Sequence, residues 1–225
     1  DGHLNIIDTT TGEMVKRTPV NGDMHGALAM SLDAQRFYGA TAATEGSNVY
    51  AFDSSTGDIL WEAELGQIYC LSPAVDEMDR VFWPTMEGLF AGYNGTTGEE
   101  LWNVDINQPS RSSVSVGPDG NLYLAGFSTN LTALNPNNGD IEWRAPLNSF
   151  SEGATVASDA LVLGDYAGFL SKIAFDGSVI WTYCPNECNA NRPTRVAIQG
   201  MPTINTGRVY FGSYDGNVYV VKEAE

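Results

Sequence analysis

Residues 51–61 read Ala-Phe-Asp-Ser-Ser-Thr-Gly-Asp-Ile-Leu-Trp, and this phrase returns along the chain at a nearly fixed period. Close copies occupy residues 92–102 and 133–143, a shortened copy occupies 174–181, and a degenerate first copy occupies 6–16. The turn glycines of successive copies are about 40 residues apart: Gly12, Gly57, Gly98, Gly139 and Gly177. A period of this length with strand-like content predicts a radial or solenoid array of small units.

Each repeat resolves into four short strands separated by turn residues. In the second repeat we expect strands at 26–32, 36–40, 47–53 and 58–64, without any segment of sustained helical period. Between the last two strands, an aspartate that bonds its own backbone and a glycine that takes a positive φ favour a hairpin turn. The first, second and fourth kinds of strand each occur five times. The third kind occurs six times, beginning near Gly2, Ser47, Gly88, Asn130, Gly168 and Gly216.

The fourth strand of each repeat carries a tryptophan at the same place. A flat ring on an outer strand can pack between neighbouring sheets and bury a large apolar area in each wedge. We therefore assign a structural docking role to four residues: Trp61, Trp102, Trp143 and Trp181. In the first copy Lys16 stands at this position, so the first wedge should be weaker or covered by another group.

The pattern Ala/Gly-x-Asp/Asn-x-x-Thr/Asn-Gly-x-x-x-Trp resembles the tryptophan-docking repeat of the pyrroloquinoline quinone (PQQ)-like β-propellers. The resemblance covers essentially the whole chain, and it implies an all-β propeller of four-stranded antiparallel blades. That superfamily includes quinoprotein alcohol dehydrogenases and a non-catalytic branch, to which an outer-membrane-assembly lipoprotein of Gram-negative bacteria belongs. The repeat serves enzymes and scaffolds alike, so it indicates the fold and not an activity.

About five blade equivalents are present, and we expect residues 1–225 to form a single domain, because no linker interrupts the repeats. The sixth copy of the third strand leaves two arrangements open. One is a closed five-blade ring with a spare or exchanged strand. The other, which we favour because family members commonly have more blades, is part of a longer propeller with exposed edges at 4–8 and 218–222. The repeats lie near 1–45, 46–87, 88–128, 129–167 and 168–215, with a partial copy at 216–225.

Composition narrows the classes of partner. The chain has 28 acidic and 11 basic residues, a formal net charge of −17. Such a surface repels phosphate backbones and anionic lipids, which argues against nucleic-acid and membrane-surface binding. A protein partner remains, and a basic partner or a cation would suit the charge. The sequence contains no apolar run long enough to span a membrane.

The cysteines bear on the compartment. Cys184 and Cys188 close a short loop rich in turn-forming residues, and a local disulfide there would imply an oxidising, extracytoplasmic compartment: secreted, periplasmic or lumenal. A zinc site would need two further ligands, for which no matching pair is visible. Cys70 is expected to be a buried free thiol.

The sequence lacks the parts that quinoprotein catalysis needs. The resemblance implies that a PQQ enzyme stacks its cofactor on a disulfide of adjacent cysteines beside a calcium ion, and no adjacent cysteine pair occurs here. The two histidines, His3 and His25, cannot build a three-histidine metal site. We therefore predict no catalytic residue, cofactor or metal, and a non-catalytic scaffold that presents loops to a protein or extended ligand, as the sensor or assembly part of a larger protein. The alternative is a fragment of a PQQ-dependent dehydrogenase without its cofactor platform.

Propellers bind partners mostly at the mouth of the central channel, on loops that enter the innermost strand. The small-residue strand should be innermost, and the residues at or just before its copies would surround the mouth. They are chemically mixed: His25, Tyr69, Arg111, Glu152 and Gln199. They are candidates for partner binding, and ordinary solvated loop residues are the alternative. Trp83 and Pro84 depart from the other copies, and we favour packing over an exposed contact for the tryptophan and expect the strand to bulge or end at the proline.

Overall fold

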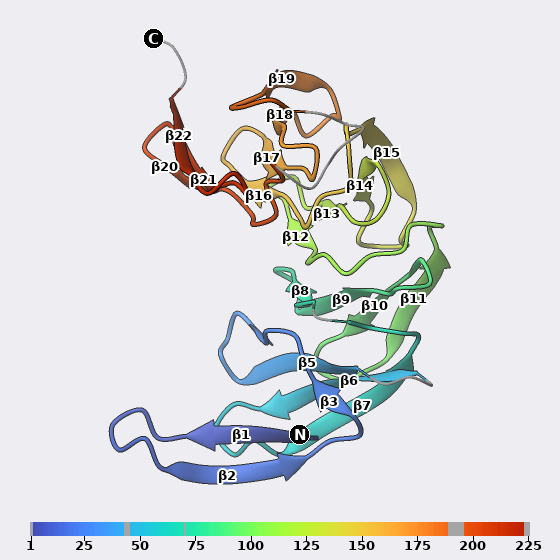
Figure 1. The fold of residues 1–225 in the computed structure, drawn as a ribbon. Coiled ribbons are helices and arrows are strands. Elements are labelled where there is room, and N and C mark those ends of the chain that lie inside the picture. Colours follow the sequence, from blue (N-terminus) through green and yellow to red (C-terminus); the bar gives the residue numbers. More distant parts are fainter. Residues whose placement is uncertain (1, 43–45, 70, 189–195, 223–225) are drawn as a thin grey trace. The chain divides into compact units, whose positions relative to one another are not determined.

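A computed structural model describes residues 2–42, 46–69, 71–188 and 196–222 (Figure 1). All regular elements in these residues are β-strands. The chain divides into two compact units, residues 1–111 and residues 112–225, which are described separately below as the first and the second unit. The single-domain organisation stays a prediction.

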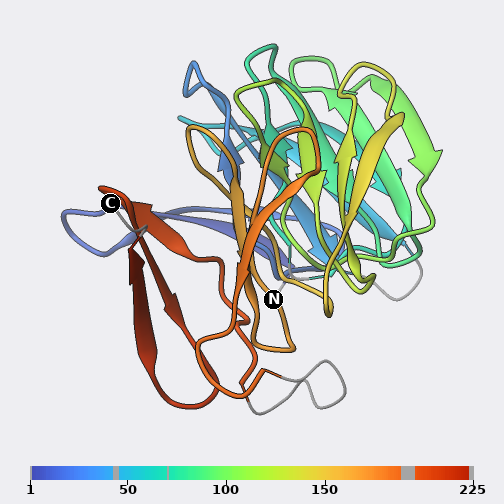
Figure 2. The ribbon, with the colours of Figure 1, turned by 90° about the horizontal axis from the view of Figure 1, so that it is seen from above.

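The strands form antiparallel sheets in which neighbours in sequence are neighbours in space, apart from the short β3. Three sheets contain four strands each, β8–β11 in the first unit and β12–β15 and β16–β19 in the second. A further sheet holds β4–β7 together with β3 (Asp23–Met24), which extends the inner edge of β5. The first unit also contains the two-stranded sheet β1–β2, and the second unit also contains the three-stranded sheet β20–β22. Within β20–β22 the strands lie side by side in both ribbon views (Figures 1 and 2).

The third and fourth strands of each repeat lie where the sequence predicts them. Below, a strand's position is its order within the repeat, from the innermost strand (first) to the outermost (fourth). Six strands occupy the third position: β1 (His3–Ile7), β6 (Ser47–Asp53), β10 (Leu89–Asn94), β14 (Asn130–Leu134), β18 (Leu170–Ile173) and β22 (Val218–Lys222). Five occupy the fourth position: β2 (Met14–Pro19), β7 (Ile59–Leu65), β11 (Glu100–Asp105), β15 (Ile141–Pro146) and β19 (Val179–Tyr183).

The innermost strands are much shorter than predicted. The second position holds β5 (Arg36–Ala42), β9 (Arg80–Pro84), β13 (Leu122–Leu124), β17 (Leu161–Gly164) and β21 (Arg208–Gly212). The first position holds only two or three residues in each sheet: β4 (Ala29–Met30), β8 (Ala74–Val75), β12 (Ser115–Val116), β16 (Thr155–Val156) and β20 (Thr203–Asn205).

Crowding between adjacent sheets explains the short inner strands. A Cβ atom added at Gly26 would overlap the carbonyl oxygen of Leu71, so only glycine fits where these two segments approach. In the second unit the hydroxyl of Ser115 donates a hydrogen bond to the carbonyl of Ala154 over 2.6 Å. Some inner segments therefore contact the next sheet by close backbone approach and side-chain hydrogen bonds, which replaces a longer ladder within their own sheet.

One row of side chains runs across each complete sheet and ends at the tryptophan. In β5–β7 the row is Tyr38, Ala51 and Trp61, which are paired in register. Corresponding rows end at Trp102, opposite Gly92, and at Trp143, opposite Ala133. A bulge follows this position in all five third-to-fourth-strand pairs, including the pair that contains Lys16. In these three sheets the small residue opposite the indole leaves room for the ring, whereas Lys172 stands opposite Trp181 in the sheet β16–β19.

Two tryptophans dock on the turn of the next sheet. The Nε1 of Trp61 donates to the carbonyl of Gly95 over 2.7 Å, and a Cβ atom at Gly98 would lie 2.7 Å from the Trp61 ring. The Nε1 of Trp143 donates to the carbonyl of Phe175 over 2.9 Å, and Gly177 packs on its ring in the same way. Positive φ angles at both glycines build these turns and leave a flat backbone surface for the indole.

The remaining docking positions differ from one another. Trp102 is buried in the first unit beside Phe82 and Phe90, with ring centroids 5.7 and 5.5 Å away. Trp181 is half-buried against a cluster that includes Val209 and Phe211. Lys16 forms an ion pair with Asp58 of the next turn, and Thr18 donates a 2.7 Å hydrogen bond to the carbonyl of Gly57. Ile6 packs on Gly57, so polar contacts and an aliphatic side chain together cover this turn in place of an indole.

Trp83 belongs to the core of the first unit, which confirms the prediction that it packs in the interior and is not an exposed contact. Its side chain is fully buried and lies edge-on to Trp61 and Tyr93, with centroids 6.4 and 5.9 Å away. The strand β9 ends at Pro84, as expected for a residue without a backbone N–H.

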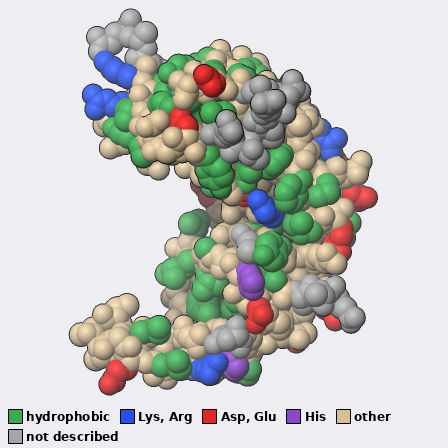
Figure 3. Space-filling model, in the orientation of Figure 1, with side chains coloured by type: hydrophobic (Ala, Val, Ile, Leu, Met, Phe, Trp, Pro, Cys, Tyr) green, Lys and Arg blue, Asp and Glu red, His purple; other side chains and the backbone are tan. Residues whose placement is uncertain are grey.

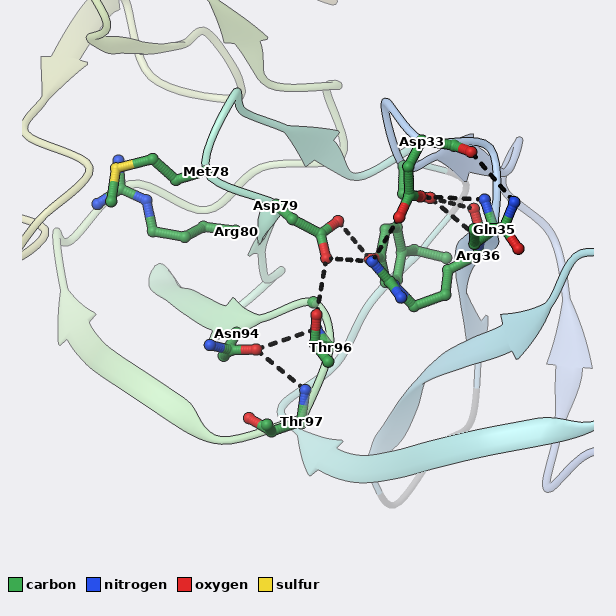
Figure 4. A network of polar contacts seen from close by, with 12 residues as sticks. Asp33, Gln35, Arg36, Met78, Asp79, Arg80, Asn94, Thr96 and Thr97 are labelled. Carbon is green, nitrogen blue, oxygen red and sulfur yellow. Dashed lines mark hydrogen bonds and ion pairs between the residues drawn. The ribbon is translucent and has the colours of Figure 1, made fainter.

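A polar network joins three turns of the first unit (Figure 4). The Asp79 carboxylate accepts hydrogen bonds from Arg36 Nη2 at 2.9 Å, Tyr38 Oη at 2.7 Å and Thr96 Oγ1 at 3.2 Å. Arg36 also pairs with Asp33 at 3.2 Å. Burial, followed by the hydrogen bond to Asp79, raises the pKa of the Tyr38 phenol well above its usual value, so Tyr38 remains a neutral donor. The network therefore ties the sheet β4–β7 to the sheet β8–β11.

Candidate protein-binding site

The predicted mouth residues of the first unit lie in loops that lead to the innermost strands. His25 follows β3, and Tyr69 lies between β7 and β8; their ring centroids are 5.8 Å apart. Tyr69 is 47% exposed, so its ring is accessible to a partner. Arg111, the last residue of this unit, is half-buried.

The predicted mouth residues of the second unit contact one another. Gln199 Nε2 donates to Glu152 Oε1 over 3.5 Å, and the phenol of Tyr166 donates to the same oxygen. Both Glu152 and Gln199 line a cleft of about 550 Å³, completed by Gly200, Met201, Gly212, Ser213 and Tyr214. The structure thus brings His25 together with Tyr69 in one unit and Glu152 together with Gln199 in the other.

Met201 and Tyr214 line this cleft, and an aromatic cluster adjoins it through the hydrogen bond from Tyr166 to Glu152. In this cluster the Phe150 and Tyr166 rings lie 4.0 Å apart, and Phe127 lies 6.0 Å from Phe150. Tyr214 is 59% exposed, and Met201 and Phe127 are 44% and 41% exposed. The space-filling view shows hydrophobic side chains reaching the surface of each unit (Figure 3). Exposed aromatic and methionine residues around a polar centre are typical of protein-binding surfaces.

Sequence reasoning missed Tyr214, which lines this cleft, and Tyr166, which bonds Glu152. It considered only the loops that enter the innermost strand, whereas Tyr166 and Tyr214 lie in turns between the second and third strands, two residues before Gly168 and Gly216. A usable signal was present in the sequence, because both turns place a tyrosine at the same offset from the turn glycine.

Asp165 has the most perturbed carboxyl group beside this site. It is only 3% exposed, and burial raises its pKa to about 6, although its carboxylate accepts hydrogen bonds from the backbone N–H groups of Ala167 and Phe169. In the next sheet Asp215 lies in the corresponding turn. The hydrogen bond from Tyr219 lowers the pKa of Asp215 to about 2.

The two pKa shifts predict opposite effects of pH. Because the folded state holds the Asp165 proton more tightly than the unfolded state, stability relative to Asp165→Asn should fall as pH rises from about 4 to 6, by up to about 3 kcal/mol. Urea unfolding at several pH values from 4 to 7.5 measures this difference. Asp215→Asn is the matched control. The free energy of unfolding of Asp215→Asn should differ from that of wild type by a constant amount over this range. The stabilisation that comes from the lowered pKa of Asp215 is lost only as pH falls from about 4 towards 2. A level profile for Asp165→Asn would contradict the assignment.

The two cysteines of the second unit are bonded to each other. A disulfide joins Cys184 to Cys188, with Cα atoms 5.7 Å apart. Cys70 lies outside the described residues. Among the side chains that the structure describes, no group of three or more His, Cys, Asp and Glu residues lies close enough to hold a metal ion. The same part of the chain contains no helix with the length and apolar character needed to cross a membrane.

Two curated relatives match most of the chain but carry different names. The chain is 27% identical to outer membrane protein assembly factor BamB of Shewanella oneidensis over 201 residues, covering 78% of this chain and 51% of the relative. It is 26% identical to tetrathionate hydrolase of Acidithiobacillus ferrooxidans, covering 79% of this chain and 38% of that protein. The chain therefore spans about half or less of the length of these relatives.

A solved structure and a family model agree on the fold. The crystal structure of BamB from Moraxella catarrhalis matches with a TM-score of 0.72 at 18% identity, covering 97% of this chain and 66% of that chain. At this identity the match establishes a β-propeller fold. The family model described as outer membrane protein assembly factor BamB matches residues 1–170. Since the match covers well over half of the sequence, the chain belongs to this family of PQQ-like repeat β-propellers.

Proposed function

We propose that this chain is part of a non-catalytic, extracytoplasmic propeller that binds a protein partner during the assembly of outer membrane proteins. The observation that carries the proposal is the cleft at Glu152, where a hydrogen-bonded polar centre is bordered by exposed Tyr214 and Met201. Tyrosine and methionine offer large contact areas, and the surrounding loops are held by rigid sheets.

The proposal also includes an extracytoplasmic compartment and the absence of catalysis. The Cys184–Cys188 disulfide favours an oxidising compartment outside the cytoplasm. The family model carries the name of an assembly factor, which favours binding over chemistry. The net charge of −17 suits a partner with a basic contact surface.

Site-specific photo-crosslinking tests the proposal. We would replace Tyr214 with a photoreactive phenylalanine analogue in the chain exported to the periplasm of a Gram-negative host. We expect crosslinks to a component of the outer membrane protein assembly machinery. The same analogue at Ile180 is the matched control, because this residue is similarly exposed, at 51% against 59%, but lies on the outer strand β19.

Three results would contradict the proposal. Position 214 could give no crosslinked partner, or positions 214 and 180 could give the same products. Alternatively, the purified chain could oxidise alcohols once PQQ and calcium are added with an artificial electron acceptor, which would support the dehydrogenase alternative.

A further inference from the structure

The outermost strands of the sheets differ in how they are protected against pairing with another strand. An edge strand presents a row of backbone N–H and C=O groups, and proteins usually guard such an edge with charged side chains or proline. Four of the five fourth strands carry two charged residues each. They are Lys16 and Arg17 in β2, Glu62 and Glu64 in β7, Glu100 and Asp105 in β11, and Glu142 and Arg144 in β15.

The strand β19 (Val179–Tyr183) is the exception. Its sequence, Val-Ile-Trp-Thr-Tyr, contains no charge and no proline, and every side chain is β-branched or aromatic. It is the outermost strand of a complete four-stranded sheet, and among the residues that the structure describes it pairs only with β18. Val179 and Ile180 are 48% and 51% exposed. The edge of β19 therefore favours strand pairing and lacks the usual protection against it.

This edge is fixed in place from two directions. On its inner side four residues of β19 pair in register with β18. Beyond its end, the disulfide between Cys184 and Cys188 closes the following loop, and Asn186 Nδ2 donates to the Asp215 carboxylate of the next sheet over 3.2 Å. A strand that is ordered in advance loses little conformational entropy when a partner pairs with it.

Acidic residues flank the apolar edge. Asp176 lies in the turn before β19, Glu187 lies in the disulfide loop after it, and both are exposed. Hydrogen bonds from the hydroxyl and the backbone N–H of Ser178 lower the pKa of Asp176, so its carboxylate is ionised at neutral pH. The lysine of the neighbouring strand, Lys172, is buried and pairs with Asp159 at 3.0 Å. Both ends of the edge therefore present negative charge.

These charges decide between two possible occupants. A second copy of the chain would pair β19 with itself about a two-fold axis. With Trp181 opposite its own copy, Asp176 would lie opposite Asn186 and beside Glu187 of the other copy, at both ends of the pair. Two chains of net charge −17 would thus bring like charges together. A partner strand with basic ends meets the same carboxylates with opposite charge.

We propose that β19 accepts an additional strand from a partner polypeptide, in which an alternating apolar centre is flanked by lysine or arginine at both ends. Main-chain hydrogen bonds along β19 hold this strand, and Asp176 and Glu187 select its basic ends. Glu152 precedes the innermost strand of the same sheet, whereas β19 is the outermost, so the two surfaces are separate. The proposal does not rest on the proposed function, and crosslinks from position 180 should differ from those from position 214.

A dye-labelled peptide tests the proposal by fluorescence anisotropy on the purified chain. The peptide is Val-Thr-Ile-Thr-Val with two lysines at each end. We expect it to bind, and Ile180→Lys, which adds a guarding charge to the edge, to weaken binding at least tenfold. Leu101→Lys is the matched control, because Leu101 holds the same place before the tryptophan of β11 and is 41% exposed. It adds the same charge and should change binding less than twofold.

Peptide variants test the same contacts without altering the protein. N-methylation of the five central residues removes the ladder donors but keeps the charge, and glutamate in place of the lysines reverses the charge of the ends. Each change should weaken binding at least tenfold. The proposal is overturned if the parent peptide does not bind, if the N-methylated peptide binds equally well, or if Ile180→Lys and Leu101→Lys behave alike. It is also wrong if the chain forms a dimer that Ile180→Lys dissociates, since a second copy is then the occupant.

Discussion

Replacing Trp61 with alanine is expected to destabilise the first unit by about 3–5 kcal/mol, the range measured for large aromatic residues removed from protein cores. The ring packs among Tyr38, Trp83 and Tyr93, and its N–H bonds the turn of the next sheet. Its removal leaves a cavity between two sheets and an unpaired carbonyl at Gly95. Urea unfolding followed by intrinsic fluorescence measures the loss.

Trp181→Ala is the matched control for this experiment. It removes the same side chain from the same row of the repeat, and both indoles are half-buried, but the Trp181 indole borders a pocket whereas the Trp61 indole bonds the turn of the next sheet. We expect a loss of about 1–2 kcal/mol, since one side of the Trp181 ring faces the pocket and its removal there enlarges an existing space. Equal losses for the two variants would contradict the view that docking on the neighbouring turn is what stabilises the wedge.

Replacing Asp79 with alanine is expected to cost about 3–4 kcal/mol, because three donors lose one shared acceptor (Figure 4). The Arg36 and Asp79 side chains are 17% and 24% exposed, so the guanidinium would be left partly desolvated without this partner. Asp79 also has φ +55°, a conformation that alanine adopts less readily than aspartate or asparagine. Asp79→Asn should therefore cost about half as much.

Asp33→Ala provides the comparison within the same network. Asp33 is the second carboxylate on Arg36, but it is 53% exposed. Exposed pairs contribute about 1 kcal/mol or less, so this variant should be close to wild type in thermal unfolding. A cost for Asp33→Ala that matches Asp79→Ala would show that the charge on Arg36, and not the bridge between turns, determines the stability.

Much of the fold could be predicted because the interactions that form each hairpin turn lie within that hairpin. The Asp53 side chain accepts hydrogen bonds from the N–H groups of Ser55 and Thr56, and Gly57 has the positive φ that the turn requires. These interactions join residues at most four positions apart. Their repetition was enough to place all six third strands and all five fourth strands.

The innermost strands and the mouth residues were harder to predict. The length of β4 depends on how closely Gly26 approaches Leu71, a residue of the next sheet. The Glu152 site depends on Tyr166 and Gln199, which reach the same carboxylate oxygen from different loops. Neither contact leaves a local pattern, because its partners are separated by a hairpin or by a whole repeat.

The sequence by itself determined the repeated unit: four antiparallel strands, an Asx-glycine turn, and a tryptophan at a fixed register. Only the tertiary structure decided that Trp61 and Trp143 are covered by a neighbouring turn whereas Trp181 borders a pocket. The physical reason is that turn conformation depends on local hydrogen bonds and φ preferences, whereas a cleft depends on the volumes of side chains that meet from different sheets. Val162 holds the row position that Tyr38 holds in β5, an exchange that is minor in the repeat pattern but that leaves no ring at the place where Tyr38 packs beside Trp61.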